Sequence, residues 1–369
     1  MKLIHTGDVH LGSAFKTLTG EQARQRNAEL LDGFRRLCTY AKENGVYAVL
    51  LAGDLFDGNQ IPAQLKKETL SIISAAAPVC FFYVSGNHDE EFTAENLPSN
   101  LYLFSDARAF KSYDLPENIC VTGLDTKYFA QAAFAQLALP PQKYNILLLH
   151  GEKGVDGGAS SENIPFARLQ NKGIDYLALG HIHKPTLTAE RLDGRGVYRY
   201  CGCLEGRGFD EVGQRGFFLL EIENGKLVKE LFLSVASREV VEVRADISAC
   251  TTYYDVENCA VQALSAVPSK NMVKLLLTGR HALGLKKDLT LLEGRLGSRF
   301  FLFRVVDESR LFIDYRAFEN DKTERGEFVR ELGRYELNED LRAEILDVGL
   351  KALAGEEIDF LLYRRLWKI

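Results

Sequence analysis

Runs of apolar residues and amphipathic segments alternate along the first half of the chain. Five short runs rich in apolar residues predict strands that are buried on both faces, at 2–6, 47–51, 79–84, 145–149 and 176–179. Two segments between the first three runs, 21–43 and 65–76, repeat apolar residues at helical spacing and predict helices. The alternation favours an α/β domain in which helices cover a sheet.

The second half of the chain has a different pattern. It is β-rich from 198 to 233, with a turn at Asn224-Gly225, and we place a domain boundary near Ser237. Beyond this boundary five segments predict a small β-α-β-α-β unit, at 240–243, 256–267, 272–278, 288–296 and 300–306. Helical spacing predominates from about Glu324 onward. We therefore predict three parts, over 1–236, 237–320 and 321–369.

Residues of the types that bind metal ions follow the predicted strands. They form five pieces: Gly7-Asp8-Val9-His10, Gly53-Asp54-Leu55-Phe56-Asp57, Gly86-Asn87-His88-Asp89, His150-Gly151-Glu152 and Gly180-His181-Ile182-His183. Five of the seven histidines in the chain fall in these pieces, which core packing alone does not explain. Because open α/β sheets place their sites at the carboxyl ends of strands, we expect the five pieces to meet in one cleft.

The side chains in these pieces indicate the kind of site. A mixture of imidazole nitrogen and carboxylate oxygen suits manganese, iron, zinc or cobalt better than an all-oxygen calcium or magnesium site. Two such ions lie about 3.5–4 Å apart in two-metal sites. A pair at this distance needs a bridging carboxylate, for which Asp54 is the natural candidate. The glycines allow tight turns after the strands, so that the ligands can converge.

The order of the five motifs resembles that of the calcineurin-like metallophosphoesterases. The fuller strings resemble the SbcD-type DNA repair exonucleases, including their YhaO-like branch: HTGDVHLG at 5–12, AGDLFD at 52–57, SGNHD at 85–89 and LGHIHKP at 179–185. The resemblance covers about the first 235 residues, and the remainder matches only in the size and order of its parts. It implies a four-layer α-β-β-α sandwich as nuclease domain, a small α+β capping domain and a helical C-terminal tail.

The resemblance also implies a role for each motif residue. One metal ion would be held by Asp8, His10, Asp54 and His183, and the other by Asp54, Asn87, His150 and His181. His88 would stabilise the transition state or protonate the leaving oxygen, oriented by Asp89. The implied reaction is hydrolysis of a phosphodiester by a water molecule that two divalent ions, usually Mn²⁺ in this family, activate for in-line attack.

The family implies DNA as substrate, a homodimer, and an SbcC-like coiled-coil ATPase as partner. The net charge of −6 excludes a uniformly basic protein, but ten Lys or Arg stand against five Asp or Glu between 264 and 316. This local excess fits a capping domain that guides DNA towards the metal cleft, and a solvated helix face would have the same composition. In the C-terminal region Trp367 is either an anchor for the ATPase or part of a tail that packs on its own core.

The sequence contains no pattern typical of a membrane span or of an export signal. The longest apolar run, 71–85, is interrupted by Pro78, and it is shorter than the roughly 20 residues that a span requires. The seven cysteines are spread along the chain and include no C-x-x-C pair. We therefore expect a cytoplasmic protein with no disulfide framework and no membrane contact.

Several polar residues near the motifs can be interpreted in two ways from the sequence. Asp57 either orients a ligand histidine or caps a helix. Arg207 and Arg215 either contact phosphate or have a structural role. Cys201 and Cys203 stand where the family carries a Pro-Gly-Ser-like turn, and they either pack in the interior or form a C-x-C metal site.

The two histidines outside the motifs have simpler interpretations. His5 lies within an apolar strand pattern, so we expect it in the core. His281 lies in the predicted capping domain, where we expect it to be exposed.

Three functions are compatible with these observations. The first is a metal-dependent DNA exonuclease that digests duplexes in the 3′-to-5′ direction, cleaves single strands internally and acts in DNA repair. The second is a nucleotide phosphodiesterase or phosphoprotein phosphatase with the same metal centre. The third is a non-catalytic scaffold subunit of an ATPase complex, against which the complete ligand set and His88 argue.

Overall fold

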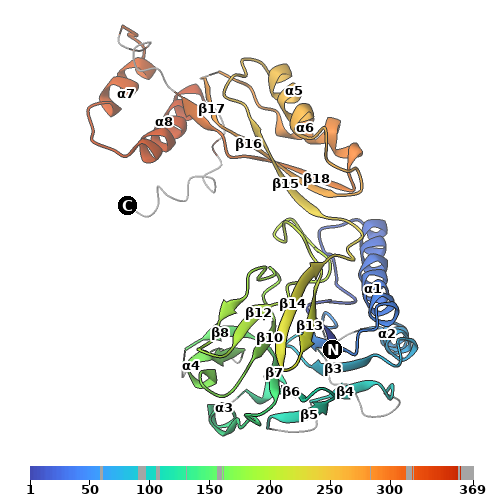
Figure 1. Cartoon of the computed structure of the whole chain (residues 1–369). Coiled ribbons are helices and arrows are strands. Elements are labelled where there is room, and N and C mark those ends of the chain that lie inside the picture. Colours follow the sequence, from blue (N-terminus) through green and yellow to red (C-terminus); the bar gives the residue numbers. More distant parts are fainter. Residues whose placement is uncertain are drawn as a thin grey trace. The chain divides into compact units, whose positions relative to one another are not determined.

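The structure, a computed structural model, divides the chain into two compact units, Met1–Glu239 and Val240–Ile369 (Figure 1). The predicted capping domain and C-terminal region fall almost entirely within the second unit. The residues that the structure describes are 1–58, 61–89, 97–104, 109–129, 131–155, 160, 162–282, 284–312, 318, 320–355 and 358.

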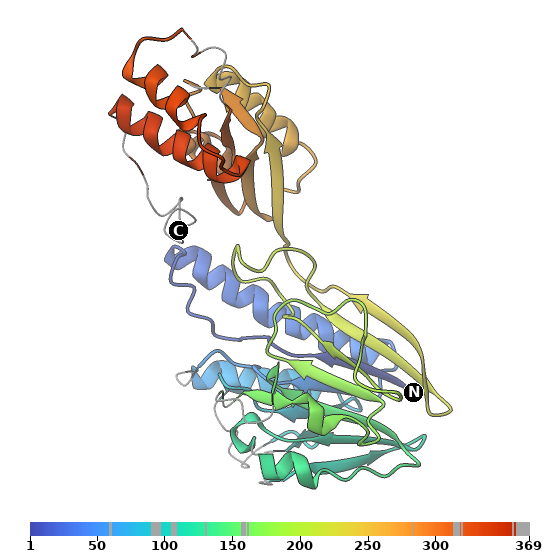
Figure 2. The ribbon, with the colours of Figure 1, turned by 90° about the vertical axis from the view of Figure 1, so that its left-hand side faces the viewer.

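Two six-stranded sheets form the first unit (Figures 1 and 2). The first sheet has the order β14-β13-β1-β2-β3-β4, in which β1 to β4 are parallel and β13 and β14 are antiparallel additions. The second has the order β11-β12-β10-β7-β6-β5, in which β12, β10, β7 and β6 are parallel. Their strands are β1 (Lys2–Thr6), β2 (Ala48–Ala52), β3 (Cys80–Val84), β4 (Leu101–Leu103), β5 (Lys111–Leu115), β6 (Ile119–Gly123), β7 (Tyr144–His150), β10 (Tyr176–Gly180), β11 (Glu190–Arg191), β12 (Val197–Tyr200), β13 (Phe217–Glu223) and β14 (Lys226–Leu233).

Successive residues of the first sheet are buried on opposite faces, as the two-residue period of a strand requires. Ile4 and Val49 belong to a core with helices α1 and α2, whereas Leu3 and Leu50 belong to a core shared with the second sheet. A third core lies between the second sheet and helices α3 and α4. Three cores between four layers confirm the predicted α-β-β-α sandwich. The helices of this unit are α1 (Gly20–Glu43), α2 (Ala63–Ala75), α3 (Gln131–Gln136) and α4 (Phe166–Leu169), with a 3₁₀ turn at Thr126–Tyr128 and a small parallel pair β8 (Glu152–Gly154) and β9 (Asn163–Pro165).

The long helix α1 shows how the local sequence sets element ends. Its N-cap Thr19 forms a capping box with Gln22, in which each side chain accepts a hydrogen bond from the other residue's backbone N–H. The face that the helix buries carries the apolar residues whose spacing predicted it, Leu30, Phe34, Leu37 and Ala41. The helix therefore covers the first sheet along its length, and it begins within a residue of the predicted start.

The structure confirms the environment of one histidine and corrects that of the other. His5 is fully buried, with Nδ1 3.0 Å from the Tyr176 hydroxyl, and burial lowers its pKa to about 3. The prediction that His281 is exposed was wrong, because only 7% of its surface is accessible. It is the inward-facing middle residue of the short strand β17 (Arg280–Ala282), and its Nε2 lies 2.8 Å from Lys287 Nζ.

The second unit contains the β-α-β-α-β order that the sequence predicts. Its parallel sheet β15-β16-β18 packs with α5 and α6 around one core, and a smaller core joins β19 to α7 and α8. Trp367 lies outside the described residues. None of the helices in the described part of the chain is long and apolar enough to span a bilayer. The elements are β15 (Val240–Asp246), α5 (Tyr253–Ala263), β16 (Met272–Thr278), β17, α6 (Leu289–Leu296), a 3₁₀ turn (Gly297–Arg299), β18 (Leu302–Asp307), β19 (Arg310–Phe312), α7 (Glu324–Leu332) and α8 (Glu339–Ala354).

Candidate metal centre

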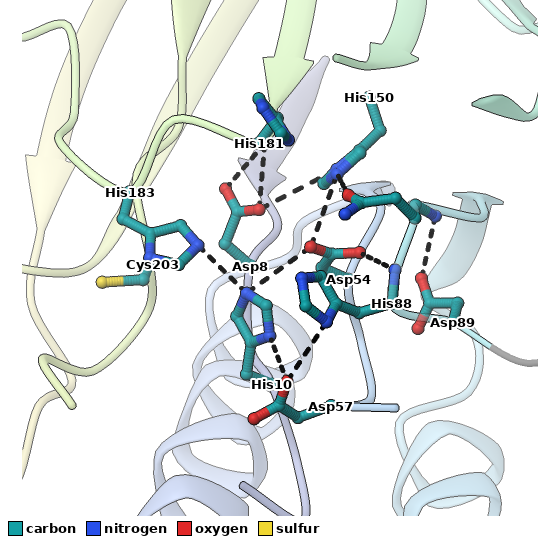
Figure 3. Close-up of polar contacts among 12 residues, drawn as sticks. Asp8, His10, Asp54, Asp57, His88, Asp89, His150, His181, His183 and Cys203 are labelled. Atoms are coloured by element: carbon teal, nitrogen blue, oxygen red, sulfur yellow. Dashed lines mark hydrogen bonds and ion pairs between the residues drawn. The ribbon is translucent and has the colours of Figure 1, made fainter. Parts of the chain in front are cut away.

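The five motifs meet where the parallel strands of both sheets end. Asp8 and His10 follow β1, and Asp54 follows β2 of the same sheet. His150 ends β7 of the second sheet, and His183 follows the neighbouring strand β10. Figure 3 shows the side chains of these residues converging on one region from the two sheets. The placement agrees with the rule that α/β folds build sites at the carboxyl ends of strands.

One group of ligand atoms surrounds the imidazoles of His10 and His183. Asp8, His10 and His183 each offer an atom within 4.8 Å of the others. The two Nε2 atoms are 3.0 Å apart, and His10 Nε2 is 3.5 Å from Asp54 Oδ2. These four residues are the set that the family resemblance implies for one ion.

A second group of ligand atoms surrounds His150. Asp8, Asp54 and His150 form it, with His150 Nε2 3.4 Å from Asp54 Oδ2 and 3.0 Å from Asn87 Oδ1. The Nδ1 of His150 lies 2.8 Å from the Ala52 carbonyl, so its N–H donates there and Nε2 is left to bind an ion. The same oxygen of Asp54 lies within 3.5 Å of ligand nitrogens in both groups, which is the position of a bridging carboxylate.

The donor set fits a pair of divalent cations. Asp8 and Asp54 are 1% and 2% exposed, and burial raises the pKa of Asp8 to about 8, with the charge of Asp54 adding to the effect. The centre therefore brings two buried carboxylates into contact with imidazole nitrogens. Positive charge placed among these groups would stabilise them. Bound ions would serve as Lewis acids towards phosphate oxygens and would lower the pKa of a water molecule.

The backbone at this site is strained in a way that the sequence does not reveal. Asp8, His10 and Asp54 have φ values of 48°, 50° and 50°, and His181 has 95°. Residues with a side chain rarely adopt this left-handed region, and such strain clusters at functional sites. The turns thus bend sharply after each strand and bring ligands from neighbouring strands together.

Glycine is required where two motif turns touch. A Cβ added to Gly86 would lie 2.1 Å from Asp54 Oδ1, and one added to Gly53 would lie 2.4 Å from the His150 ring. Gly53 also has a φ of +82°. These two glycines therefore let the Asp54 turn pack directly against the turns that carry the ligands of the second group.

The side chain of His181 lies outside the ligand groups found among the described residues. Its Nε2 is 3.6 Å from Glu162 Oε2, and its ring packs edge to face on His150. Its backbone N–H donates to both carboxylate oxygens of Asp8, at 2.9 and 3.1 Å. In the structure His181 therefore orients Asp8 through its backbone.

His88 lies at the open side of the cluster, with 47% of its side chain exposed. Its Nδ1 is 3.4 Å from Asp57 Oδ1, and its backbone N–H donates to Asp54 Oδ1 at 3.0 Å. The orienting contact that we expected from Asp89 comes instead from Asp57. Asp89 accepts the backbone N–H groups of Phe56 and Gly86, both at 2.9 Å, so it fixes the two motif turns to each other.

The structure also decides between the two interpretations of Asp57. Its Oδ1 lies 3.4 Å from His10 Nδ1, and the hydrogen bond with His10 lowers the pKa of Asp57 well below its usual range. The N-cap position of helix α2 is Pro62, and no side chain caps this helix, so Asp57 does not cap it. Asp57 therefore orients the imidazoles of His10 and His88.

Sequence reasoning missed two carboxylates near the histidine ligands. Glu211 Oε1 lies 2.6 Å from His183 Nδ1, and although burial opposes it, this hydrogen bond and the charge of Arg207 lower the pKa of Glu211 to about 2. Glu162 lies beside His181. Neither residue follows a predicted strand or belongs to a recognisable motif, so no local signal could have identified them.

The two cysteines near the site are fully buried. Cys201 Sγ lies 3.8 Å from Asp8 Oδ2, and Cys203 Sγ lies 3.6 Å from Glu211 Oε2. Neither belongs to any group of potential metal ligands in the described residues. Figure 3 shows Cys203 on the far side of His183 from the ligand cluster. This placement agrees with a packing role behind the metal ligands.

The two arginines of the same loop differ in their surroundings. Arg215 is buried, and its guanidinium donates to the backbone carbonyl of Gln214. Arg207 donates to side chains of the metal centre, including Asp57 at 3.3 Å.

Comparisons with known proteins relate this site to a family. Residues 1–185 match the family model described as calcineurin-like phosphoesterase, a range that includes every motif residue from Asp8 to His183. The chain is 30% identical over 249 residues to the metallophosphoesterase YhaO of Bacillus subtilis, covering 62% of this chain and 59% of YhaO.

Two relatives have names that describe nucleic-acid functions. The SbcD component of the nuclease SbcCD of Staphylococcus epidermidis is 24% identical over 284 residues, which cover 66% of this chain and 72% of that protein. The DNA double-strand break repair protein Mre11 of Methanopyrus kandleri is 28% identical over 290 residues, which cover 67% of this chain and 60% of Mre11. The chain thus spans about three fifths of the length of YhaO and Mre11. From the family match, and from the ligand groups that agree with it, the chain belongs to the calcineurin-like phosphoesterases, metal-dependent hydrolases of phosphoesters whose fold binds two divalent ions.

Proposed function

We propose that the chain is a metal-dependent DNA exonuclease that digests duplex DNA in the 3′-to-5′ direction and cleaves single strands internally. The observation that carries the proposal is the position of Asp54 Oδ2, within 3.5 Å of His10 Nε2 and 3.4 Å of His150 Nε2, which suits a two-ion site. The names of the SbcD and Mre11 relatives support DNA as the substrate. By the same likeness, we propose action in DNA repair as a homodimer with an SbcC-like ATPase.

The residues of the centre divide into ligands and a proton donor. Asp8, His10, Asp54 and His183 would hold one ion, and Asp54, Asn87, His150 and His181 the other, with Mn²⁺ as the proposed metal. Bound ions would neutralise charge on phosphate oxygens and supply a nucleophilic water. The chain's own contribution is to hold the ligands in place before substrate binds, so that little reorganisation accompanies the reaction.

His88 is the proposed catalytic side chain that does not bind metal. Its Nδ1 faces Asp57 Oδ1, which holds the ring and leaves Nε2 as the nitrogen that can meet a substrate. A protonated imidazole in this position can donate to a phosphate oxygen and pass its proton to the leaving oxygen. The exposure of His88 lets a substrate reach this nitrogen.

Charge on the second unit supports a nucleic-acid substrate. Several of the cations between 264 and 316 have exposed side chains, including Arg280, Lys286, Arg304 and Arg310. Exposed cations attract phosphate backbones without regard to sequence. We therefore propose that this unit contacts DNA.

The proposal is tested by offering several substrates to the Mn²⁺-loaded protein. These are linear duplex DNA labelled at either the 3′ or the 5′ end, circular single-stranded DNA, and bis(p-nitrophenyl) phosphate. We expect early release of the 3′ label, opening of the circle and much slower reaction of an Asn87→Ala variant. Hydrolysis of the small ester with every DNA left intact would overturn the DNA proposal in favour of a small phosphodiester or phosphoprotein.

Substitution of His88 separates an enzyme from a scaffold. His88→Asn is expected to lower kcat by about 10²- to 10⁴-fold, the usual contribution of a general acid. Because His88 is not a proposed ligand, the variant should still bind the same number of Mn²⁺ ions. A variant with unaltered biological activity would instead indicate a scaffold whose metal site does not turn over.

A further inference from the structure

Arg207 and Glu211 lie behind the two histidine ligands that come from opposite sheets. Glu211 Oε1 contacts His183 Nδ1 at 2.6 Å, and Arg207 Nη2 lies 3.4 Å from the same oxygen. On the other side Arg207 Nη1 lies 3.3 Å from Asp57 Oδ2, whose other oxygen is 3.4 Å from His10 Nδ1. A continuous series of polar contacts therefore runs from one histidine to the other through Arg207.

These contacts determine which ring nitrogen faces the centre. A carboxylate accepts hydrogen bonds and cannot donate them, so Glu211, at 2.6 Å, favours the proton on Nδ1 of His183, although Arg207 Nη2 also lies 3.3 Å from this nitrogen. Asp57 Oδ1 lies farther from His10 Nδ1, at 3.4 Å, and favours the same tautomer of His10 more weakly. Both Nε2 atoms then carry a lone pair, and they lie 3.0 Å apart. Two lone pairs at this separation repel each other unless a cation lies between them, so the contacts prepare the rings for metal binding.

Arg207 pairs with both of the carboxylates that contact the ligand imidazoles, Asp57 and Glu211. Glu211 is 7% exposed, and Asp57 is 21% exposed. A guanidinium stays charged in proteins and can pair with two carboxylates at once through its planar fork. Without it, the two carboxylates would repel each other or turn towards the metal ions, and they would no longer hold the imidazoles.

The loop that carries Arg207 is itself anchored. The backbone N–H of Arg207 donates to Glu211 Oε2 at 2.6 Å. Two residues earlier, the buried carboxylate of Glu205 accepts the backbone N–H groups of Ser237 and Arg238 and pairs with the fully buried Arg26. Arg26 also donates to the Gly206 carbonyl at 2.6 Å. The backbone at and just before Arg207 is therefore anchored, which restricts where its guanidinium can lie.

We propose that Arg207 and Glu211 are positioning residues of the metal centre, which fix the tautomers and ring orientations of His183 and, through Asp57, of His10. The proposal rests on the metal centre of the proposed function, but it does not depend on DNA as the substrate. Both residues lie beyond residues 1–185, the range that matches the family model. They extend the centre into the loop between β12 and β13.

The test measures tautomers and metal affinity in addition to activity. In metal-free protein labelled with ¹⁵N at its seven histidines, we expect His10 and His183 to carry the proton on Nδ1. In Glu211→Gln, whose amide can donate or accept, we expect a tautomer mixture at His183. By calorimetry, Glu211→Gln and Arg207→Gln should bind one Mn²⁺ about 10- to 100-fold more weakly, the usual effect of losing such a partner. The second ion should change less, because His150 is oriented by the Ala52 carbonyl.

Controls separate this effect from general damage. Arg195 pairs with Asp175 away from the motif residues, so Arg195→Gln should bind both ions as the wild type does. If Arg207→Gln fails to fold, Arg207→Lys serves instead, with an expected fall of about tenfold because a single ammonium cannot bridge both carboxylates. Unchanged tautomers and unchanged affinity in the folded variants would overturn the proposal. Wild-type protein that binds Mn²⁺ as expected but cleaves no DNA would overturn the nuclease function only.

Discussion

Replacing Asp54 by asparagine is expected to lower the rate of phosphoester hydrolysis by about 10³-fold or more. The variant keeps the shape of the side chain but loses the negative charge that lies beside ligand nitrogens of both groups. Metal ions contribute several kcal/mol to the stabilisation of transition-state charge, and each 1.36 kcal/mol corresponds to about tenfold in rate. Loss of a bridging ligand should weaken the binding of both ions at once. The fall in rate should therefore exceed the fall caused by replacing any single residue that contacts only a ligand.

The measurement is kcat/KM on a chromogenic phosphodiester, with bound Mn²⁺ counted on the same samples. Asp32→Asn is a matched control, because Asp32 is an exposed residue of α1 paired with Arg35. We expect the control to match the wild type in both readouts. An Asp54→Asn enzyme within tenfold of wild-type activity and with two bound ions would show that Asp54 does not bridge them.

Removal of metal ions should destabilise the protein, and more strongly as the pH rises. Burial raises the pKa of Asp8 to about 8 and that of Asp89 to about 7. A carboxyl group whose pKa is raised in the folded state contributes stability at low pH that is lost as the pH rises through the folded-state value. Over the range tested, the metal-free protein should therefore lose stability from pH 6.5 to about pH 8, above which both carboxyl groups are ionised in the folded state as well. His5 and His150, whose pKa values burial lowers, titrate below this window.

Thermal unfolding with Mn²⁺ or with EDTA at pH 6.5, 7.5 and 8.5 measures this effect. Metal at about 100 times its dissociation constant stabilises a folded protein by about 2.7 kcal/mol, which corresponds to roughly 5–10 °C for a unit of this size. The difference between the two midpoints should increase with pH, since metal binding also requires deprotonated ligands. A difference that is constant or shrinks over this range would contradict the assignment of Asp8 as a buried ligand.

The residues that gather at the centre could be predicted because their signal is local. Asp8, Asp54 and His150 each follow or end an apolar run, and parallel strands bring their carboxyl ends to one edge. Glycines such as Gly53 mark the turns in the sequence. The apolar strands likewise predicted a sheet with cover on both faces, whereas the four-layer sandwich was predicted from the resemblance to the family.

The contacts through which Glu211 and Arg207 support the ligands could not be predicted, because their signal is not local. Glu211 contacts His183 from 28 positions away, and Asp57 contacts Arg207 from 150 positions away. Only the folded loop between β12 and β13 brings Glu211 and Arg207 to these partners. Likewise, Asp89 is adjacent to His88 in sequence, yet its carboxylate accepts hydrogen bonds from backbone N–H groups of two turns. Adjacency in sequence therefore identified the motif but not the function of each member.

The central claim, a pair of metal ions bridged by Asp54, is tested most directly by anomalous diffraction from crystals grown with Mn²⁺. We predict two peaks about 3.5–4 Å apart, one beside His10 and His183 and the other beside Asn87 and His150, with Asp54 in contact with both. A single peak at saturating Mn²⁺, no peak, or two peaks without Asp54 between them would contradict this account.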